Sequence, residues 1–192
     1  MPRVVDQQRF TERQTVILAA AYRCFAAQGF EGTTTADVCR AARVSSGTLF
    51  HYFPTKIDIL LTLLRASAAW TEEHLHRATR TGRGKPALAS YLTALDREHD
   101  AERQAGFTRA VHGAAHLPEV RAVLVEEAEL VDRFLLEHIT EAVRTRAART
   151  DVPPERLARW TRWIIDGEAV DDDEQRPAGR LSVAVRSLLD LG

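Results

Sequence analysis

Cysteine and long apolar runs are both scarce in this sequence, and each absence excludes a class of protein. Two cysteines among 192 residues exclude a disulfide framework of the kind that stabilises small secreted domains. No segment approaches the ~18 consecutive apolar residues of a membrane span, and the N-terminus has no secretory pattern. Strand-like alternation of apolar and polar residues is also missing. We therefore expect a cytoplasmic, all-α protein with no membrane contact.

Charge is distributed unevenly along the chain, although the formal net charge is only −1. Residues 1–65 carry 8 basic and 5 acidic side chains, whereas residues 66–192 carry 18 and 22. Only the first part suits a polyanionic partner such as DNA. Its excess of positive charge is small. A protein that binds DNA through one defined surface is therefore favoured over a coat protein that binds DNA by charge alone.

A helix pair is specified locally between residues 33 and 56, where the chain reads TTTADVCRAARVSSGTLFHYFPTK. Thr34 and Asp37 have the spacing of a capping box, which predicts a helix that begins near Thr35. Small residues in this helix would allow a second helix to cross closely. Its apolar stripe at helical spacing consists of Val38, Ala41 and Ala42.

A turn at Arg43 and Val44 follows, and Ser45 is placed to cap a second short helix that runs to His51. Leu49 faces inward, which leaves the other side chains of this helix for another surface. Small and hydroxyl-bearing residues at the N-terminal end of such a helix suit close approach to base edges and phosphate oxygens. The pair is a helix-turn-helix, and we expect its outer side to contact double-stranded DNA.

The segment closes with an aromatic pair and an isolated lysine. Pro54 favours an extended residue before it, Thr55 can cap the next helix, and Lys56 lies in the first turn. A cation there works against the helix dipole. Lys56 is one of only two lysines among 26 basic residues, and its unfavourable position fits phosphate neutralisation. The alternative is a solvated lysine beside a packed Tyr–Phe pair.

Residues from about Val16 to Leu64 resemble the N-terminal domain of the TetR family of one-component bacterial transcription regulators. The match lies in ILAAAYRCFAAQGFEGTT, the VSSGTLFHYF core and the closing Lys56. The resemblance implies three DNA-binding helices, a helical regulatory domain, a homodimer on a palindromic operator, and release from DNA by a small molecule. It also implies DNA contacts, mostly to phosphate, from Thr33, Ser45, Thr48, Tyr52 and Lys56.

Three positions depart from the usual pattern of that family. Arg43 stands in place of a common turn glycine, Ser46 in place of a longer basic residue, and Phe50 in place of tyrosine. The last two lose groups that could contact DNA, so operator sequence and affinity do not transfer from relatives. We expect a DNA-binding domain at residues 1–55 and an effector-binding and dimerisation domain at 56–192. The expected DNA-binding residues are Thr33, Thr34, Arg43, Ser45, Ser46, Gly47, Thr48, Phe50, His51, Tyr52 and Lys56.

Almost all of the remaining chain reads as helix. After a polar N-terminal tail, Thr11 and Gln14 form a further capping box, which predicts a helix that stops at Gly29. A long helix from Lys56 to about His76 would connect the two domains. Further helices are predicted at residues 87–100, 101–115, 118–149, 154–170 and 179–191.

The last two predicted helices carry apolar stripes that suit an oligomer interface. A glycine in the first stripe allows close approach, so the two helices could form half of a four-helix dimer interface. The stretch WTRWIIDGEAV also resembles the C-terminal region of a TetR subgroup that includes betaine-responsive repressors, although Glu168 occupies a usually apolar position. The alternative is internal packing alone. The expected interface residues are Leu157, Trp160, Ile164, Gly167, Leu181, Val185 and Leu188.

Aromatic and apolar side chains on several predicted helices could converge on an effector cavity, because cavities between helices are common ligand sites. The alternative for each side chain is packing in the core. A lining of this kind predicts a small-molecule effector that is largely apolar. The expected contacts are Trp70, Tyr91, Leu95, Phe107, Val111, His112, Phe134 and Trp163.

Metal binding and catalysis have little support in the sequence. His112 and His116 have the i, i+4 spacing that can hold a metal, and Glu73 with His76 forms one E-x-x-H, but further ligands are missing. No phosphate loop, nucleophile elbow or Cys–His constellation is present. We expect no metal, no cofactor and no enzymatic activity. A helical-bundle metal protein or enzyme, and an architectural DNA binder without an effector, remain the alternatives to a ligand-responsive repressor.

Overall fold

The computed structural model of the chain describes residues 2–97, 101–171 and 179–191, and every regular element within these ranges is a helix. The all-α prediction is therefore confirmed. The helices are α1 (Pro2–Gly32), α2 (Thr35–Ala42), α3 (Ser46–Tyr52), α4 (Lys56–Arg80), α5 (Lys85–Arg97), α6 (Ala101–Gly113), α7 (Pro118–Arg144), α8 (Pro154–Val170) and α9 (Arg180–Leu189).

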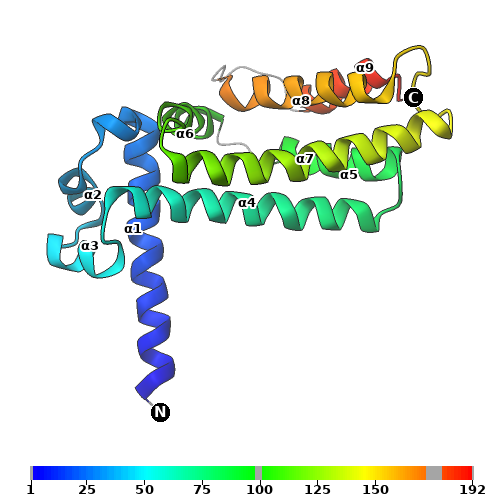
Figure 1. Ribbon diagram of the computed structural model, residues 1–192. Coiled ribbons are helices and arrows are strands. Elements are labelled where there is room, and N and C mark those ends of the chain that lie inside the picture. The colour runs from blue at the N-terminus through cyan, green and yellow to red at the C-terminus, as the bar shows by residue number, and fades with distance from the viewer. Residues whose placement is uncertain (1, 98–100, 172–178, 192) are drawn as a thin grey trace.

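The long helix α4 connects two groups of helices. α4, α5 and α7 lie side by side, and α8 and α9 pack over them (Figure 1). α1, α2 and α3 gather at the N-terminal end of α4, where α6 also packs against α1 (Figure 1). α4 thus runs from the small helical unit into the larger bundle, and the contact between α6 and α1 joins the two a second time.

α1 begins earlier than the sequence predicted. Instead of a polar tail before a capping box at Thr11, the helix runs from Pro2, and the Thr11 carbonyl accepts a hydrogen bond from the Thr15 hydroxyl at 2.9 Å inside it. The predicted stop at Gly29 is confirmed as a break, because Gly29 has φ 74° and ψ 170°. Glycine reaches this left-handed region without the penalty that a Cβ brings.

The capping interactions around the helix pair follow the sequence closely. The Thr34 hydroxyl accepts the Asp37 amide at 3.1 Å, the Asp37 carboxylate accepts the Thr34 amide at 3.0 Å, and α2 begins at Thr35 as predicted. Hydrogen bonds from Thr34 lower the pKa of Asp37, with a further contribution from Arg40. Ser45 caps α3 by accepting the Thr48 amide at 3.1 Å.

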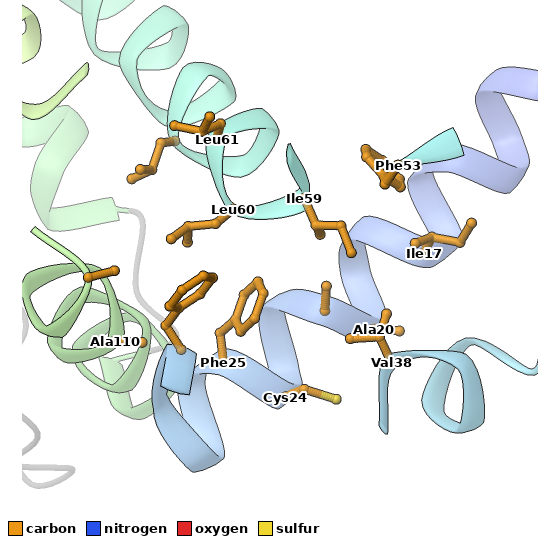
Figure 2. Packing of buried hydrophobic residues seen from close by; sticks show 14 of the residues in the cluster. Ile17, Ala20, Cys24, Phe25, Val38, Phe53, Ile59, Leu60, Leu61 and Ala110 are labelled. Carbon is orange, nitrogen blue, oxygen red and sulfur yellow. The ribbon is translucent and has the colours of Figure 1, made fainter. Parts of the chain in front are cut away.

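Two hydrophobic clusters hold the chain together. The first contains residues from α1, α2, α3 and the start of α4, and it also takes in side chains of α6 and α7 (Figure 2). The second lies among α5, α7, α8 and α9 and the second half of α4. Because the first cluster joins residues from both sides of position 55, the domain division predicted there lies within a shared core. That division stays a prediction.

Two details of the first core differ from the predicted stripe of α2. Cys39 takes the buried position, 8% exposed, whereas Ala41 is exposed. Cys24 of α1 is buried in the first core as the sequence indicated, and burial raises the pKa of its thiol. The core of the small unit therefore contains both cysteines as reduced, buried side chains.

The contact between α1 and α6 is the closest helix approach marked by a glycine. A Cβ placed on Gly106 would lie 2.5 Å from the carbonyl oxygen of Ala26. Only a residue without a side chain allows the two backbones to come this near. The next residue, Phe107, stacks on Tyr22 of α1 with ring centroids 4.6 Å apart.

Candidate nucleic-acid interface and ligand cavity

The turn between α2 and α3 is closed by Arg43 in a left-handed conformation. Its φ is 54° and its ψ is 47°, and its amide donates to the carbonyl oxygen of Arg40 at 3.3 Å. Non-glycine residues adopt this conformation at a cost of roughly 1–2 kcal/mol. The predicted turn is confirmed, and Arg43 keeps the glycine geometry while carrying an exposed guanidinium next to α3.

α3 presents a polar outer side and is anchored by one leucine. Leu49 is fully buried, whereas Phe50 is 47% exposed. The hydroxyl groups of Ser45 and Thr48 lie 2.9 Å apart at the start of the helix. A short helix that is fixed by a single apolar anchor can lie in the major groove with its remaining side chains directed to DNA. The predicted DNA-binding residues that are exposed here are Thr34, Arg43, Ser45, Ser46, Gly47, Phe50 and His51, with Thr48 and Tyr52 partly buried.

Thr33 is an exception among the predicted DNA contacts. Its residue is 1% exposed, and its hydroxyl donates to the Gly29 carbonyl at 2.8 Å. The side chain closes the last turn of α1 and does not reach the surface. The physical reason is the break at Gly29, which leaves a carbonyl that needs a donor.

Lys56 has structural partners that the sequence did not reveal. Its Nζ donates to the carbonyl oxygens of Phe30 at 2.7 Å and Thr33 at 3.0 Å, and it lies 4.3 Å from the centroid of the Phe30 ring. The ammonium therefore stabilises the C-terminal end of α1, where cations are favourable. An ammonium group has three donors, and these two carbonyl oxygens occupy two of them.

The N-terminal half of α1 contributes residues beside α3 that are not in the predicted DNA-binding set. The Phe10 ring packs on Tyr52 with centroids 4.4 Å apart. Arg9 and Arg13 lie around the same hollow, which Tyr52 also lines, and both are exposed. Glu12 lines the same hollow, so the three charged side chains leave an excess of one positive charge beside the helix-turn-helix.

A cavity of about 580 Å³ lies in the larger helical group, between α4, α5, α6, α7 and α8. Its volume is in the range of small-molecule sites. Six of the eight predicted effector contacts line it: Trp70, Tyr91, Leu95, Phe107, Val111 and His112.

The other two predicted contacts lie elsewhere. Phe134 is one turn beyond the cavity, where it packs on Tyr91 at 5.3 Å and on His138 at 4.4 Å between ring centroids. Trp163 is 61% exposed and lines a separate hollow between α7 and α8, together with Asp132 and Leu136. The α8 residues that line the cavity include Arg162 and Ile165. One residue after Arg162 points roughly 100° further round the helix, which turns Trp163 outward.

Three charged residues of the cavity were missed by sequence reasoning, namely Glu127, Arg162 and Asp166. Glu127 accepts the hydroxyl of Thr71 at 2.6 Å, and Arg162 donates to Asp166 at 2.8 Å. Burial raises the pKa of the Tyr91 phenol beyond its usual range; the nearby carboxylates raise it further, and Arg162 opposes them. A signal was present, because Glu127 interrupts the apolar stripe of α7 between Leu124 and Val131.

The predicted dimer residues divide into two groups. Trp160, Ile164 and Leu188 are partly buried and Gly167 is exposed, with no atom within 4 Å of a Cβ placed on it. Trp163 of α8 and Val183 of α9 are 61% and 67% exposed, and Trp163 shares a hollow with Asp132 and Leu136 of α7. The remaining three predicted residues are buried in the second core of the chain itself, where they support α8 and α9 from beneath: Leu157, Leu181 and Val185.

The described residues provide neither a metal site nor a membrane-spanning helix. No group of three or more His, Cys, Asp or Glu side chains in these ranges is arranged to hold a metal ion. His116 lies 3.9 Å from Glu31, and its ring nitrogen contacts the Gly113 carbonyl at 3.0 Å. No described helix combines the length and the apolar character needed to cross a membrane.

The fold and these two sites define a class of protein, a helix-turn-helix unit joined to a helical bundle with an internal cavity. Residues 17–63 match the family described as bacterial regulatory proteins, tetR family. Over 162 residues the chain is 30% identical to the HTH-type transcriptional repressor AcnR of Corynebacterium efficiens, covering 79% of this chain and 77% of that repressor. The chain belongs to the TetR family, and the resemblance drawn from its sequence is confirmed.

Solved structures share the fold at lower sequence identity. The ketosteroid transcriptional regulator KstR2 of Mycobacterium tuberculosis matches with a TM-score of 0.76 and 18% identity, covering 92% of this chain and 91% of that one. AibR in complex with isovaleryl coenzyme A and operator DNA matches with a TM-score of 0.76 and 20% identity, covering 94% and 100%. At these identities the likeness establishes the fold alone.

Proposed function

We propose that this chain is a homodimeric transcriptional repressor that binds a palindromic operator and is released from it by a small molecule. The observation that carries the proposal is the pairing of an exposed helix-turn-helix with a cavity of about 580 Å³ in the bundle behind it. Membership of a family of bacterial regulatory proteins supports the first half. The complex of the similar regulator AibR with a ligand and operator DNA supports the second.

DNA binding is assigned to α3 and its flanks. The exposed residues of α3 would enter the major groove, while Tyr52, Lys56 and the guanidinium of Arg43 would contact phosphates. Arg9 and Arg13 of α1 lie beside Tyr52 and add positive charge to this surface. Phosphate contacts of this kind would make affinity depend steeply on salt.

A dimer is assigned to the outer sides of α8 and α9. A palindrome needs two reading helices held about 34–36 Å apart, so that they enter successive major grooves. The exposed Trp163 and Val183 and the open surface at Gly167 suit a partner helix pair. The same apolar residues would otherwise remain in contact with water.

Two connections would carry ligand binding to the DNA surface. Trp70 lines the cavity and lies 14 residues after Lys56 on α4, a rise of ~1.5 Å per residue or roughly 21 Å. Phe107 lines the same cavity and stacks on Tyr22 of α1 at 4.6 Å. A ligand that binds the conformation with tilted α4 and α6 better than the DNA-binding conformation would weaken DNA binding. The loss of DNA affinity cannot exceed the ratio of the ligand's affinities for the two conformations.

The test is a DNA-shift assay of the purified full-length protein on its own upstream region, with and without small-molecule extracts. We expect a shifted protein–DNA complex that dissociates when an extract containing the effector is added. Trp70→Ala and Phe107→Ala should raise the concentration needed for release while leaving ligand-free DNA binding nearly intact. Wild-type release in both variants would place the effector elsewhere.

The same assay separates the two alternatives. An architectural DNA binder would shift many unrelated sequences equally, and no extract would release it from DNA. A helical-bundle enzyme or metal protein would give no shift at all. Thr35→Ala is a control for DNA binding, because it leaves the capping residues Thr34 and Asp37 and the helix α3 unchanged. This variant should bind DNA as the wild type does.

A further inference from the structure

The charged groups that line the ligand cavity are not balanced. Arg162 is its only Lys or Arg among the described lining residues, whereas Glu127 and Asp166 both carry carboxylates. The Arg162 guanidinium is already engaged, because it donates to Asp166 at 2.8 Å, to Asp132 at 3.3 Å and to the Ala128 carbonyl at 3.2 Å. An anionic ligand would have to compete with two aspartates for this one cation.

Glu127 is the carboxylate that lacks a cationic partner. It is partly buried on α7, and one of its oxygens accepts the hydroxyl of Thr71 at 2.6 Å. Within the part of the chain that the structure describes, no Lys or Arg forms an ion pair with it. A carboxylate that lines a cavity between helices is stabilised by a ligand that brings positive charge.

Tyr91 provides an independent observation at the same place. The residue is 3% exposed and lines the cavity, yet its hydroxyl has no hydrogen-bond partner among the described residues. The fully buried, unpartnered polar atom among the described residues is Thr161 Oγ1 and not the Tyr91 oxygen, so the phenol oxygen opens onto the cavity and is available to a ligand. The phenol oxygen and the Glu127 carboxylate can therefore both accept a hydrogen bond from a donor group of a ligand in the cavity.

Aromatic side chains line the cavity together with these groups, and each is fixed by a second ring. Trp70 stacks on His74 at 3.8 Å, Phe107 on Tyr22 at 4.6 Å, and Tyr91 packs on Phe134 at 5.3 Å between ring centroids. Rings that are held in place attract a cation by their quadrupole, with about 0.5–2 kcal/mol for each favourable contact. The same rings accommodate the apolar part of a ligand.

We propose that the effector of this regulator is an organic cation, with an ammonium group that pairs with Glu127 and Tyr91 and an apolar body that lies among Trp70, Phe107 and the neighbouring aliphatic side chains. This inference rests on the proposed function and names the chemical class of its effector. It refines the expectation of a largely apolar ligand, because the lining supplies a negative charge that the sequence stripe did not reveal.

The experiment compares three probes of one shape and different charge: phenethylamine, phenethyl alcohol and phenylacetate. Their binding to the full-length protein at neutral pH is measured by titration calorimetry without DNA. The amine should bind roughly tenfold more tightly than the alcohol, a difference of about 1.4 kcal/mol, and phenylacetate more weakly than either.

Glu127→Gln is the decisive variant, because glutamine keeps an acceptor for Thr71 and removes only the charge. It should lower affinity for the amine about tenfold and leave affinity for the alcohol unchanged, which also verifies that the cavity is intact. The control Glu126→Gln, an exposed neighbour on the same helix, should bind all three probes as the wild type does.

Several outcomes would overturn this assignment. They are equal binding of amine and alcohol, preference for phenylacetate, an unaltered amine affinity in Glu127→Gln, and no binding of the amine at millimolar concentration. Failure of the broader proposal looks different, because it would appear as an absence of operator binding by the ligand-free protein. The two results are obtained in separate assays.

Discussion

Gly106 offers the sharpest test of how the two helical groups are joined. Replacing it by alanine adds a Cβ that would lie 2.5 Å from the Ala26 carbonyl oxygen, and also 3.2 Å and 3.3 Å from the carbonyl and α carbons of that residue. Ordinary contact requires at least 3.4 Å, so α1 and α6 must separate by about 0.9 Å. All three contacts are with backbone, which no side-chain rotation can relieve.

The magnitude follows from two opposing effects. Overpacking of this kind costs about 1–3 kcal/mol, whereas replacing glycine by alanine within a helix stabilises by roughly 0.5–1 kcal/mol. We expect a net loss of about 1–2 kcal/mol in the free energy of unfolding. For a chain of this size that corresponds to a melting temperature lowered by ~2–8 °C.

The measurement is a thermal melt followed by circular dichroism, at one fixed protein concentration because a dimer melts in a concentration-dependent way. Gly113→Ala is the matched control on the same helix, since a Cβ there meets no atom within 4 Å, and it should melt at or slightly above the wild-type temperature. A Gly106→Ala protein as stable as this control would refute the close approach of α1 and α6.

The separation of these helices should also alter the response to ligand. Phe107 follows Gly106 directly, and its ring contacts both the cavity and Tyr22 of α1. Moving α6 away from α1 would loosen this contact, so Gly106→Ala should need more effector for the same release of DNA. Unchanged release in a destabilised variant would exclude α6 as a carrier of the signal.

Three further predictions concern other parts of the molecule. Lys56→Met should lower the free energy of unfolding by about 1–3 kcal/mol, because Nζ donates to two carbonyl oxygens. It should also reduce the salt slope of operator binding by about one. Wild-type stability of this variant in a urea titration would contradict the prediction. Gly167→Trp should give a folded monomer by sedimentation and weaken operator binding, since the space around it is open within one protomer. Burial lowers the pKa of His138, so the unfolded chain binds its proton first and stability should fall as pH drops below about 6.5; His138→Asn should remove that part of the pH dependence of urea unfolding.

Local chemistry explains why the helix-turn-helix could be predicted so closely. Thr34 with Asp37, and Ser45 with Thr48, are three residues apart, and their hydrogen bonds form wherever the backbone turns into a helix. The turn at Arg43 is equally local, because its left-handed geometry completes the end of α2. No distant part of the chain has to be known for these elements to begin and end where they do.

Side-chain direction was the first feature that sequence alone left open. Trp163 and Arg162 are adjacent, yet Trp163 is 61% exposed outside the ligand cavity, whereas Arg162 lines it. Either side chain fits an apolar or amphipathic stripe of α8. Which of the two lines the cavity depends on how α8 is rotated against α7. The same rotation buries Leu157 and exposes Gly167.

By itself, the sequence determined the helical class, the position of nearly every helix and the reading unit from Thr34 to Lys56, because spacing and capping act within a few residues. Tertiary structure alone decided that Lys56 caps the end of α1, that Glu127 lines the cavity without a cationic partner among the described residues, and that α6 lies close against α1. These depend on contacts between residues that are tens of positions apart in the chain, and such contacts exist only once the helices have packed.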